Sequence, residues 1–141
     1  MPPRVLIVEE SLPYRRVIRE ALVSFRHCEV DDTPSAESAF EMCLKREYAL
    51  LLIALPLQPF AGDTLDRLIA KAYPFAHPGK HTAPPVIYLL RQAEIPRIYD
   101  LQRDARVRGH LTIPPRLDTL LALTQNLLPP PLSGAPPAGG L

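Results

Sequence analysis

The sequence predicts one α/β domain with a doubly wound, five-stranded parallel sheet. Three observations support this fold class: short continuous apolar runs, helical apolar stripes between them, and a length of 141 residues. Five runs alternate with five stripes, as in folds whose helices cover both faces of a parallel sheet. A chain of this length buries roughly two-thirds of the surface that its unfolded form exposes, which suits a single core.

The expected strands are short runs rich in β-branched and other apolar residues. They occupy residues 5–8, 27–30, 48–55, 86–90 and 110–113. The third run is the most apolar segment of the chain, so we expect it at the centre of the sheet.

Five segments between and after these runs have apolar residues at helical spacing. They occupy residues 11–25, 36–44, 65–72, 95–105 and 117–128. Ser11 can cap the first helix, and Pro13 is tolerated in its first turn. Asp31 and Asp32 are interpreted as loop and helix-cap residues before the second helix. Residues 74–85 form an expected loop that contains four prolines, and it is longer than the usual helix-to-strand connection.

Composition limits the classes of function. A formal net charge of +1 gives no overall field to attract nucleic acid or an anionic membrane. Cys28 and Cys43 lack metal-pair spacing, and no secretory leader precedes the first apolar run, so we expect a reduced, cytoplasmic protein. The longest apolar stretch, residues 49–57, is far below the roughly 20 residues of a membrane helix. We expect a domain at residues 1–128 and a disordered, proline- and glycine-rich tail at 129–141.

In a doubly wound sheet, ligands bind beyond the carboxyl ends of the strands, where the strand order reverses. The candidate functional positions are therefore Glu9 and Glu10, which follow the first strand, together with the ends of the third, fourth and fifth strands.

Three stretches resemble the receiver domain of bacterial response regulators. RVLIVEES at residues 4–11, followed by RRVIR at 15–19, is similar to the family's first strand, acidic pair and first helix. PVIYL at 85–89 is similar to its fourth strand, and GHLTIP at 109–114 to its fifth strand and terminal Lys-Pro. The resemblance covers about residues 4–128. It implies a CheY-like, flavodoxin-like (βα)5 fold with strand order 2-1-3-4-5.

In the family, a phosphoryl group is transferred to an aspartate at the end of the third strand. Mg²⁺ is held there by that aspartate and the acidic pair, and a lysine and a hydroxyl stabilise the phosphoryl charge. The family places a glycine eight residues after the acceptor, so Gly62 assigns the acceptor position to Ala54. Residues 48–62 contain no Asp, Glu or His, so a shifted alignment supplies no acceptor either.

The other phosphorylation residues are missing as well. The hydroxyl position falls on Leu90, and the lysine position before Pro114 falls on Ile113. Every lysine lies earlier in the chain, at Lys45, Lys71 and Lys80. We therefore expect Ala54, Leu90 and Ile113 to form an apolar, degenerate phosphorylation site that packs closed and is locked in one conformation.

Glu9 and Glu10 remain from the acidic pair. Two carboxylates alone make a poor Mg²⁺ site, so we expect no metal and no other cofactor. They are interpreted as solvated carboxylates at a strand end, with Arg91 as a candidate ion-pair partner.

The resemblance also implies a switch and partner surface between the fourth and fifth helices. The residues assigned to it are Arg91, Tyr99, Arg103, Arg106 and His110. His110 falls at the family's aromatic switch position, although Leu90 leaves no hydroxyl for a rotating ring to report on.

We therefore expect a non-enzymatic pseudo-receiver, which acts in signal transduction as a phosphorylation-independent protein-interaction module. Its expected partner is another signalling protein or a second copy of the chain. Neither nucleic acid nor a membrane is expected. The alternatives are a conventional phosphorelay receiver of a two-component system and a flavodoxin-like small-molecule binding domain, because fold alone does not define function.

Overall fold

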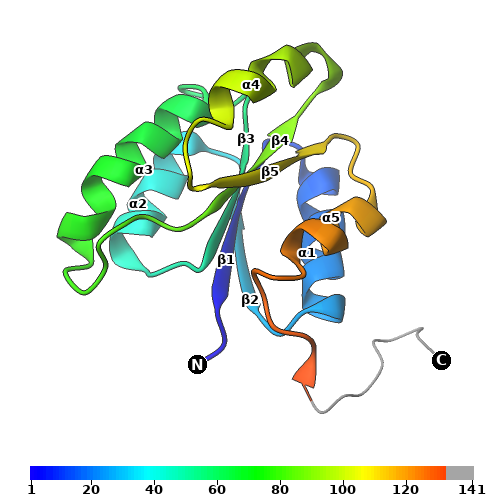
Figure 1. Cartoon of the computed structure of the whole chain (residues 1–141), viewed down its shortest axis with the longest axis horizontal. Helices are drawn as coiled ribbons and strands as arrows, with labels where there is room; N and C mark the ends of the chain where they lie inside the picture. The colour runs from blue at the N-terminus through cyan, green and yellow to red at the C-terminus, as the bar shows by residue number, and fades with distance from the viewer. Residues whose placement is uncertain (133–141) are drawn as a thin grey trace.

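The computed structural model describes residues 1–132. Most of the tail predicted at 129–141 therefore lies outside the described residues. Within residues 1–132 the sheet has five parallel strands in the order β2-β1-β3-β4-β5, which confirms the predicted fold class and strand order. Figure 1 shows α1 and α5 on one face of this sheet and α2 and α3 on the other.

The bounds of the elements agree with the predicted alternation. The strands are β1 (Arg4–Val8), β2 (Glu29–Thr33), β3 (Leu50–Ala54), β4 (Val86–Leu90) and β5 (Val107–Thr112). The helices are α1 (Leu12–Phe25), α2 (Ala36–Lys45), α3 (Gly62–Ala76), the 3-10 helix η1 (Gln92–Arg97), α4 (Ile98–Leu101) and α5 (Leu117–Thr124). No helix within residues 1–132 is long and apolar enough to cross a membrane.

The centre of the sheet follows directly from the apolar runs. Every residue of β3 and of β4 is buried, because helices cover both faces of these strands. In α1, Ser11 is the N-cap and its hydroxyl accepts a hydrogen bond from the Tyr14 amide, while Pro13 lies in the first turn. The predicted cap and proline position of this helix are both confirmed.

The prediction for β2 is wrong at both ends. The strand begins at Glu29 and includes Asp31 and Asp32, which align with Leu6 and Ile7 of β1. Ser35 caps α2 instead, since its hydroxyl accepts a hydrogen bond from the Ser38 amide. A strand at the sheet edge can carry these carboxylates because arginines on both faces pair with them.

Helix α3 runs through Pro74, which was predicted to begin the loop. Pro74 lies in the last turn, where the His77 amide still donates a hydrogen bond to the Tyr73 carbonyl. The Tyr73 ring is buried, and its hydroxyl accepts a hydrogen bond from the Tyr48 amide at 2.9 Å. This anchor of the final turn was not apparent from the apolar spacing, which predicted a helix over residues 65–72 only.

The fourth helical segment is shorter than predicted and the fifth strand is longer. Pro96 lies in η1, and α4 is a single turn. β5 already begins at Val107, with an irregular register opposite the start of β4. Gly109 in this strand has a φ of 149°, and a Cβ there would lie 2.7 Å from a methyl group of Leu123. A glycine is therefore needed where β5 passes α5.

Candidate functional site

The carboxylate that follows β1 is enclosed by protein. Glu9 is 0% exposed, and both of its oxygens accept hydrogen bonds from Arg91, Oε1 from Nη1 at 2.6 Å and Oε2 from Nη2 at 2.9 Å. Oε2 also accepts a hydrogen bond from the Ser11 amide at 2.8 Å. This forked pair is a strong, directional charge-assisted contact.

Arg91 follows β4 and is itself held in place. Its amide donates a hydrogen bond to Glu94 Oε1 at 2.8 Å, and its guanidinium lies 5.8 Å from the centre of the Tyr14 ring. The hydrogen bond to Glu9 raises the pKa of Arg91. Arg91 therefore connects the turn after β4 to the turn after β1.

These contacts revise two interpretations of the sequence. The ion pair between Glu9 and Arg91 is confirmed, but the idea that Glu9 is a solvated carboxylate is wrong. Arg91, assigned to the partner surface, is instead directed into the site. The reason is that a fully buried carboxylate needs a charged partner to offset its lost hydration.

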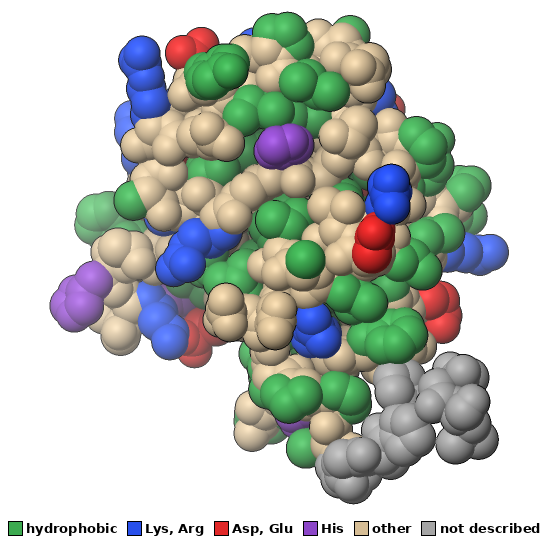
Figure 2. Space-filling view, turned by 45° about the vertical axis from the view of Figure 1, so that its right-hand side comes forward, with side chains coloured by type: hydrophobic (Ala, Val, Ile, Leu, Met, Phe, Trp, Pro, Cys, Tyr) green, Lys and Arg blue, Asp and Glu red, His purple; other side chains and the backbone are tan. Residues whose placement is uncertain are grey.

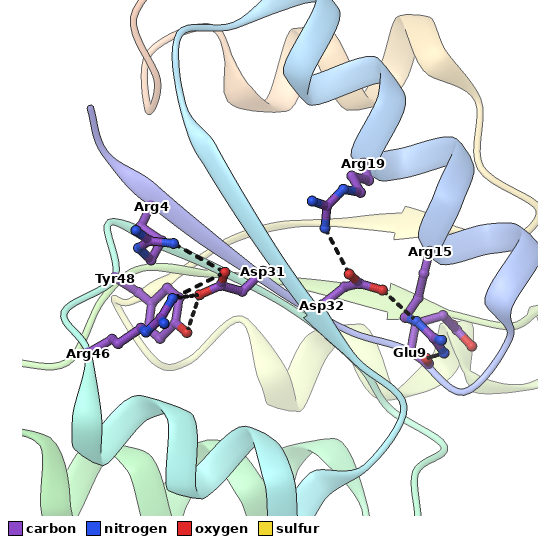
Figure 3. A network of polar contacts seen from close by, with 8 residues as sticks. All are labelled: Arg4, Glu9, Arg15, Arg19, Asp31, Asp32, Arg46 and Tyr48. Atoms are coloured by element: carbon purple, nitrogen blue, oxygen red, sulfur yellow. Dashed lines mark hydrogen bonds and ion pairs between the residues drawn. The ribbon is translucent and has the colours of Figure 1, made fainter. Parts of the chain in front are cut away.

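The second member of the acidic pair has a different environment. The Glu10 side chain is exposed, and its carboxylate makes no ion pair within residues 1–132. The backbone beside it is fixed by Arg15, whose Nη1 donates to the carbonyls of Glu9 and Glu10 at 2.8 and 3.1 Å. Figure 3 shows Arg15 between Glu9 and Asp32, whose Oδ2 accepts a hydrogen bond from Arg15 Nε at 2.8 Å.

Three apolar residues occupy the carboxyl ends of the next strands. Ala54 ends β3 and Leu90 ends β4, and both are 0% exposed, while Ile113 directly after β5 is 6% exposed. The Ile113 amide donates a hydrogen bond to the Leu90 carbonyl at 2.8 Å. Pro114 follows and is exposed. An aliphatic surface therefore stands at the positions where the resemblance placed acceptor, hydroxyl and lysine.

Gly62, which assigned the acceptor position, lies against the end of β3. Its amide donates a hydrogen bond to the Leu55 carbonyl at 2.8 Å. A Cβ on Gly62 would lie only 2.1 Å from the Ala54 carbonyl oxygen. The eight-residue spacing between Ala54 and Gly62 thus corresponds to a direct backbone contact.

The residues present do not fit a Mg²⁺ site. This ion prefers several carboxylate and carbonyl oxygens, but the Glu9 oxygens are engaged by a guanidinium and Ala54 provides no carboxylate. Within residues 1–132, no three His, Cys, Asp or Glu side chains are arranged to hold a metal ion.

A polar network that the sequence did not predict surrounds β2 (Figure 3). Asp31 accepts hydrogen bonds from Arg4 at 3.1 Å, from Arg46 at 3.2 Å and from the Tyr48 hydroxyl at 2.7 Å. Burial, together with the bond to Asp31, raises the pKa of Tyr48. Asp32, on the other face, pairs with the arginines of α1. The alternation of side chains along β2 could have indicated two separate roles for these carboxylates.

Arg106, also assigned to the partner surface, is largely buried. Its guanidinium donates hydrogen bonds to Asp66 at 2.9 and 3.1 Å and to the carbonyl of Pro84 at 2.8 Å. Asp66 is 3% exposed, and burial raises its pKa although the bonds from Arg106 act in the opposite direction. This pair ties α3 to the start of β5.

The remaining surface residues are spread out. Tyr99 is 82% exposed and Arg103 is exposed, whereas His110 is half-buried beside a cavity of about 10 Å³ lined by Leu90 and Leu101. In Figure 2, which brings the α5 side forward, hydrophobic side chains form several small groups separated by other side chains. Of the five residues assigned to the partner surface, Tyr99 and Arg103 are the ones that project into solvent.

The fold is shared with solved receiver domains. The signal receiver domain of an HD domain-containing protein from Pseudomonas fluorescens Pf-5 matches with a TM-score of 0.74 and 19% identity, over 90% of this chain and 94% of that one. The receiver domain of AraT, a response regulator from Geobacillus stearothermophilus, matches with a TM-score of 0.70 and 20% identity, over 90% and 93%. A response regulator receiver protein from Pseudomonas putida matches with a TM-score of 0.71 and 24% identity, over 89% and 97%.

No protein-family model matches the chain, and no curated protein matches its sequence. The structural likeness shows the fold, which is that of CheY-like receiver domains.

Proposed function

We propose that this chain acts in signal transduction as a phosphorylation-independent, receiver-like module that binds another protein. The likeness to receiver domains supports a signalling role. The observation that carries the proposal is the Glu9–Arg91 pair beside Ala54. The Glu9 carboxylate is bound by a guanidinium, and Ala54 has no carboxylate to accept a phosphoryl group.

Three physical obstacles to phosphorylation support this function. Ala54 has no nucleophilic oxygen. Mg²⁺ binding would require the Glu9 carboxylate to leave a guanidinium that binds both of its oxygens. Leu90 and Ile113 offer neither a hydroxyl nor a cation to a phosphoryl group, so we propose no catalysis and no metal cofactor.

Two exposed side chains support the proposal that the chain binds a partner. Tyr99 is a large ring exposed over most of its area, and Arg103, four residues later in the chain, is also exposed. Tyrosine and arginine are enriched among the residues that dominate binding energies. We propose that they contact another signalling protein in the cytoplasm.

Phosphotransfer tests this proposal. The chain is incubated with acetyl phosphate and, separately, with histidine kinases of its native host, and covalent phosphate is measured by intact mass. We expect no incorporation in the wild type. Phosphate on the wild-type chain would overturn the proposal, and Ala54→Asp serves as the variant that carries a carboxylate at the acceptor position.

The binding part has its own readout. Capture of partners from a native-host lysate is compared between the wild type and Tyr99→Ala/Arg103→Ala. We expect a specific protein retained by the wild type and lost by the double variant. A captured set that is identical for both proteins would place the contact elsewhere and contradict the assignment.

A further inference from the structure

The outer surface of α2 and α3 carries exposed hydrophobic side chains. Phe75 is 86% exposed and Leu68 is 41% exposed on α3, and Leu44 is 37% exposed on α2. Leu68 and Phe75 are seven residues apart, so they lie on the same face of α3, two turns from each other. α2 and α3 pack side by side on one face of the sheet (Figure 1). We define these three side chains as the α2–α3 patch.

The net charge beside this patch differs in sign between α2 and α3. Glu37 and Glu41 precede Leu44 at spacings of seven and three residues, which places all three on one face of α2. Arg67 and Lys71 lie beside Leu68 on α3, and all four charged residues are exposed. Lys45, the last residue of α2, is exposed as well, so the surface beside the patch carries a net negative charge over α2 and a positive charge over α3.

These charges are largely uncompensated within the chain. In the part of the chain from residue 1 to 132, Glu37, Glu41 and Lys71 make no ion pair and no side-chain hydrogen bond. Arg67 has only a 3.8 Å contact with Asp63 one turn earlier, in an exposed position. Pairs of this kind contribute little to the stability of a monomer, so these side chains are available to another molecule.

We propose that the α2–α3 patch binds a second copy of this chain. A two-fold axis parallel to the helices would set α2 of each copy against α3 of the other, since a two-fold interface uses the same surface on both subunits. Glu37 and Glu41 of one copy would then face Arg67 and Lys71 of the partner. Phe75 would bury its ring against the hydrophobic side chains of the opposing patch.

The arrangement of charges favours a second copy of the chain as the partner. A uniformly acidic or uniformly basic partner would be repelled by one of the two helices, whereas a copy related by this axis matches both. The patch includes neither Tyr99 nor Arg103, although Arg67 beside it lines the same surface pocket as Arg103. The inference goes beyond the proposed function and does not depend on the phosphorylation state of the chain.

Sedimentation velocity of the full chain tests the dimer. We expect the wild type to show a monomer–dimer equilibrium that depends on protein concentration. Phe75→Glu should raise the dimer Kd by about 30-fold or more, as expected when a central aromatic contact is lost. Val23→Glu is the control, because it places the same charge on an exposed hydrophobic side chain of α1, outside the patch and outside the proposed signalling surface. We expect its Kd to be that of the wild type.

Charge reversal tests the pairing of α2 with α3. Arg67→Glu with Lys71→Glu should weaken the dimer, and adding Glu37→Lys and Glu41→Lys in the same chain should restore it. All of these side chains are exposed, so the variants should keep the wild-type thermal unfolding curve. A wild type that stays monomeric at every concentration would overturn the inference, as would a dimer that Phe75→Glu leaves intact or that Val23→Glu disrupts. None of these outcomes affects the phosphotransfer result.

Discussion

The Glu9 carboxylate and the Arg91 guanidinium meet across the carboxyl ends of β1 and β4, although the two residues are 82 positions apart in the sequence. Both carboxylate oxygens are bound, and the carboxylate is excluded from water. The negative charge of the strand-end site is therefore neutralised by the chain itself. This contact joins the turn after β1 to the turn after β4.

Arg91→Met should lower the free energy of unfolding by about 3 kcal/mol, because Glu9 would be left buried without a charged partner. We place the loss at the lower end for a buried pair, since the Arg91 side chain is 33% exposed. Urea unfolding at neutral pH measures it. Adding Glu9→Gln should recover part of the loss, and a fully additive double variant would contradict a direct interaction.

The exposed pair between Arg116 and Asp118 provides the control for this cycle. Its nitrogen–oxygen distance is 3.0 Å, comparable with the buried pair, but the side chains are 77% and 70% exposed. Arg116→Met should leave the unfolding midpoint unchanged, because solvent screens an exposed ion pair. An equal loss for Arg116→Met and Arg91→Met would show that burial is not the source of the effect.

Gly62→Ala should destabilise the fold by about 2 to 3 kcal/mol, because the new methyl group would overlap the end of β3. It would lie 2.1 Å from the Ala54 carbonyl oxygen and 2.9 Å from a methyl group of Ile53. Gly79→Ala is the matched substitution, since no atom lies within 4 Å of its Cβ position. Thermal unfolding should separate the two, and a Gly62→Ala midpoint equal to that of Gly79→Ala would contradict the close contact.

Cys43 should resist alkylation in the native protein. Burial raises the pKa of its thiol to about 12, against an ordinary value of 9.0. The reactive thiolate is therefore roughly a thousandfold rarer at neutral pH than for a free cysteine. Its labelling rate should rise about tenfold for each pH unit up to that pKa. Mass spectrometry of iodoacetamide-treated protein, native against urea-unfolded, measures the protection, and rapid native labelling of Cys43 would contradict it.

Arg106→Met should lower the free energy of unfolding more at neutral pH than in acid. Burial raises the pKa of Asp66, and removing Arg106 also removes the bonds that act in the opposite direction. A carboxyl group whose folded pKa is raised binds its proton more tightly in the native state. The stability that this proton contributes to the folded protein is fully present below the unfolded pKa. It is lost as the pH rises through the folded pKa. Urea unfolding of variant and wild type at about pH 4 and pH 7 tests this order; a larger penalty in acid would contradict it.

The apolar character of the strand ends could be predicted, because it depends only on which residue types occur in short segments. The run that became β3 contains no acceptor carboxylate, and the run that became β4 contains no hydroxyl other than the Tyr88 phenol, so small alignment errors did not matter. The pairing of Arg91 with Glu9 could be suggested from strand ends that meet at one sheet edge. The burial of Glu9 could not, because it depends on how residues far apart in the chain pack together.

The predictions of secondary structure were wrong where contacts between residues far apart in the chain outweigh the local sequence pattern. Asp31 and Asp32 have the composition of a turn, yet partners contributed by β1, α1 and α2 hold them in an edge strand. Pro74 ends most helical patterns, but the buried Tyr73 beside it anchors one more turn. Neither partner set can be read from sequence spacing alone.

The most direct measurement is the amide NMR spectrum of the wild-type chain, recorded with and without Mg²⁺ and beryllofluoride, an analogue of the phosphoryl group. With Ala54 as the acceptor position and Glu9 bound to Arg91, we predict no change in the amide signals of Glu9, Ala54, Arg91 and Ile113. A receiver with a conventional site, recorded in parallel, shows that the reagent is active. Saturable shifts of those four signals in this chain would contradict phosphorylation-independent function.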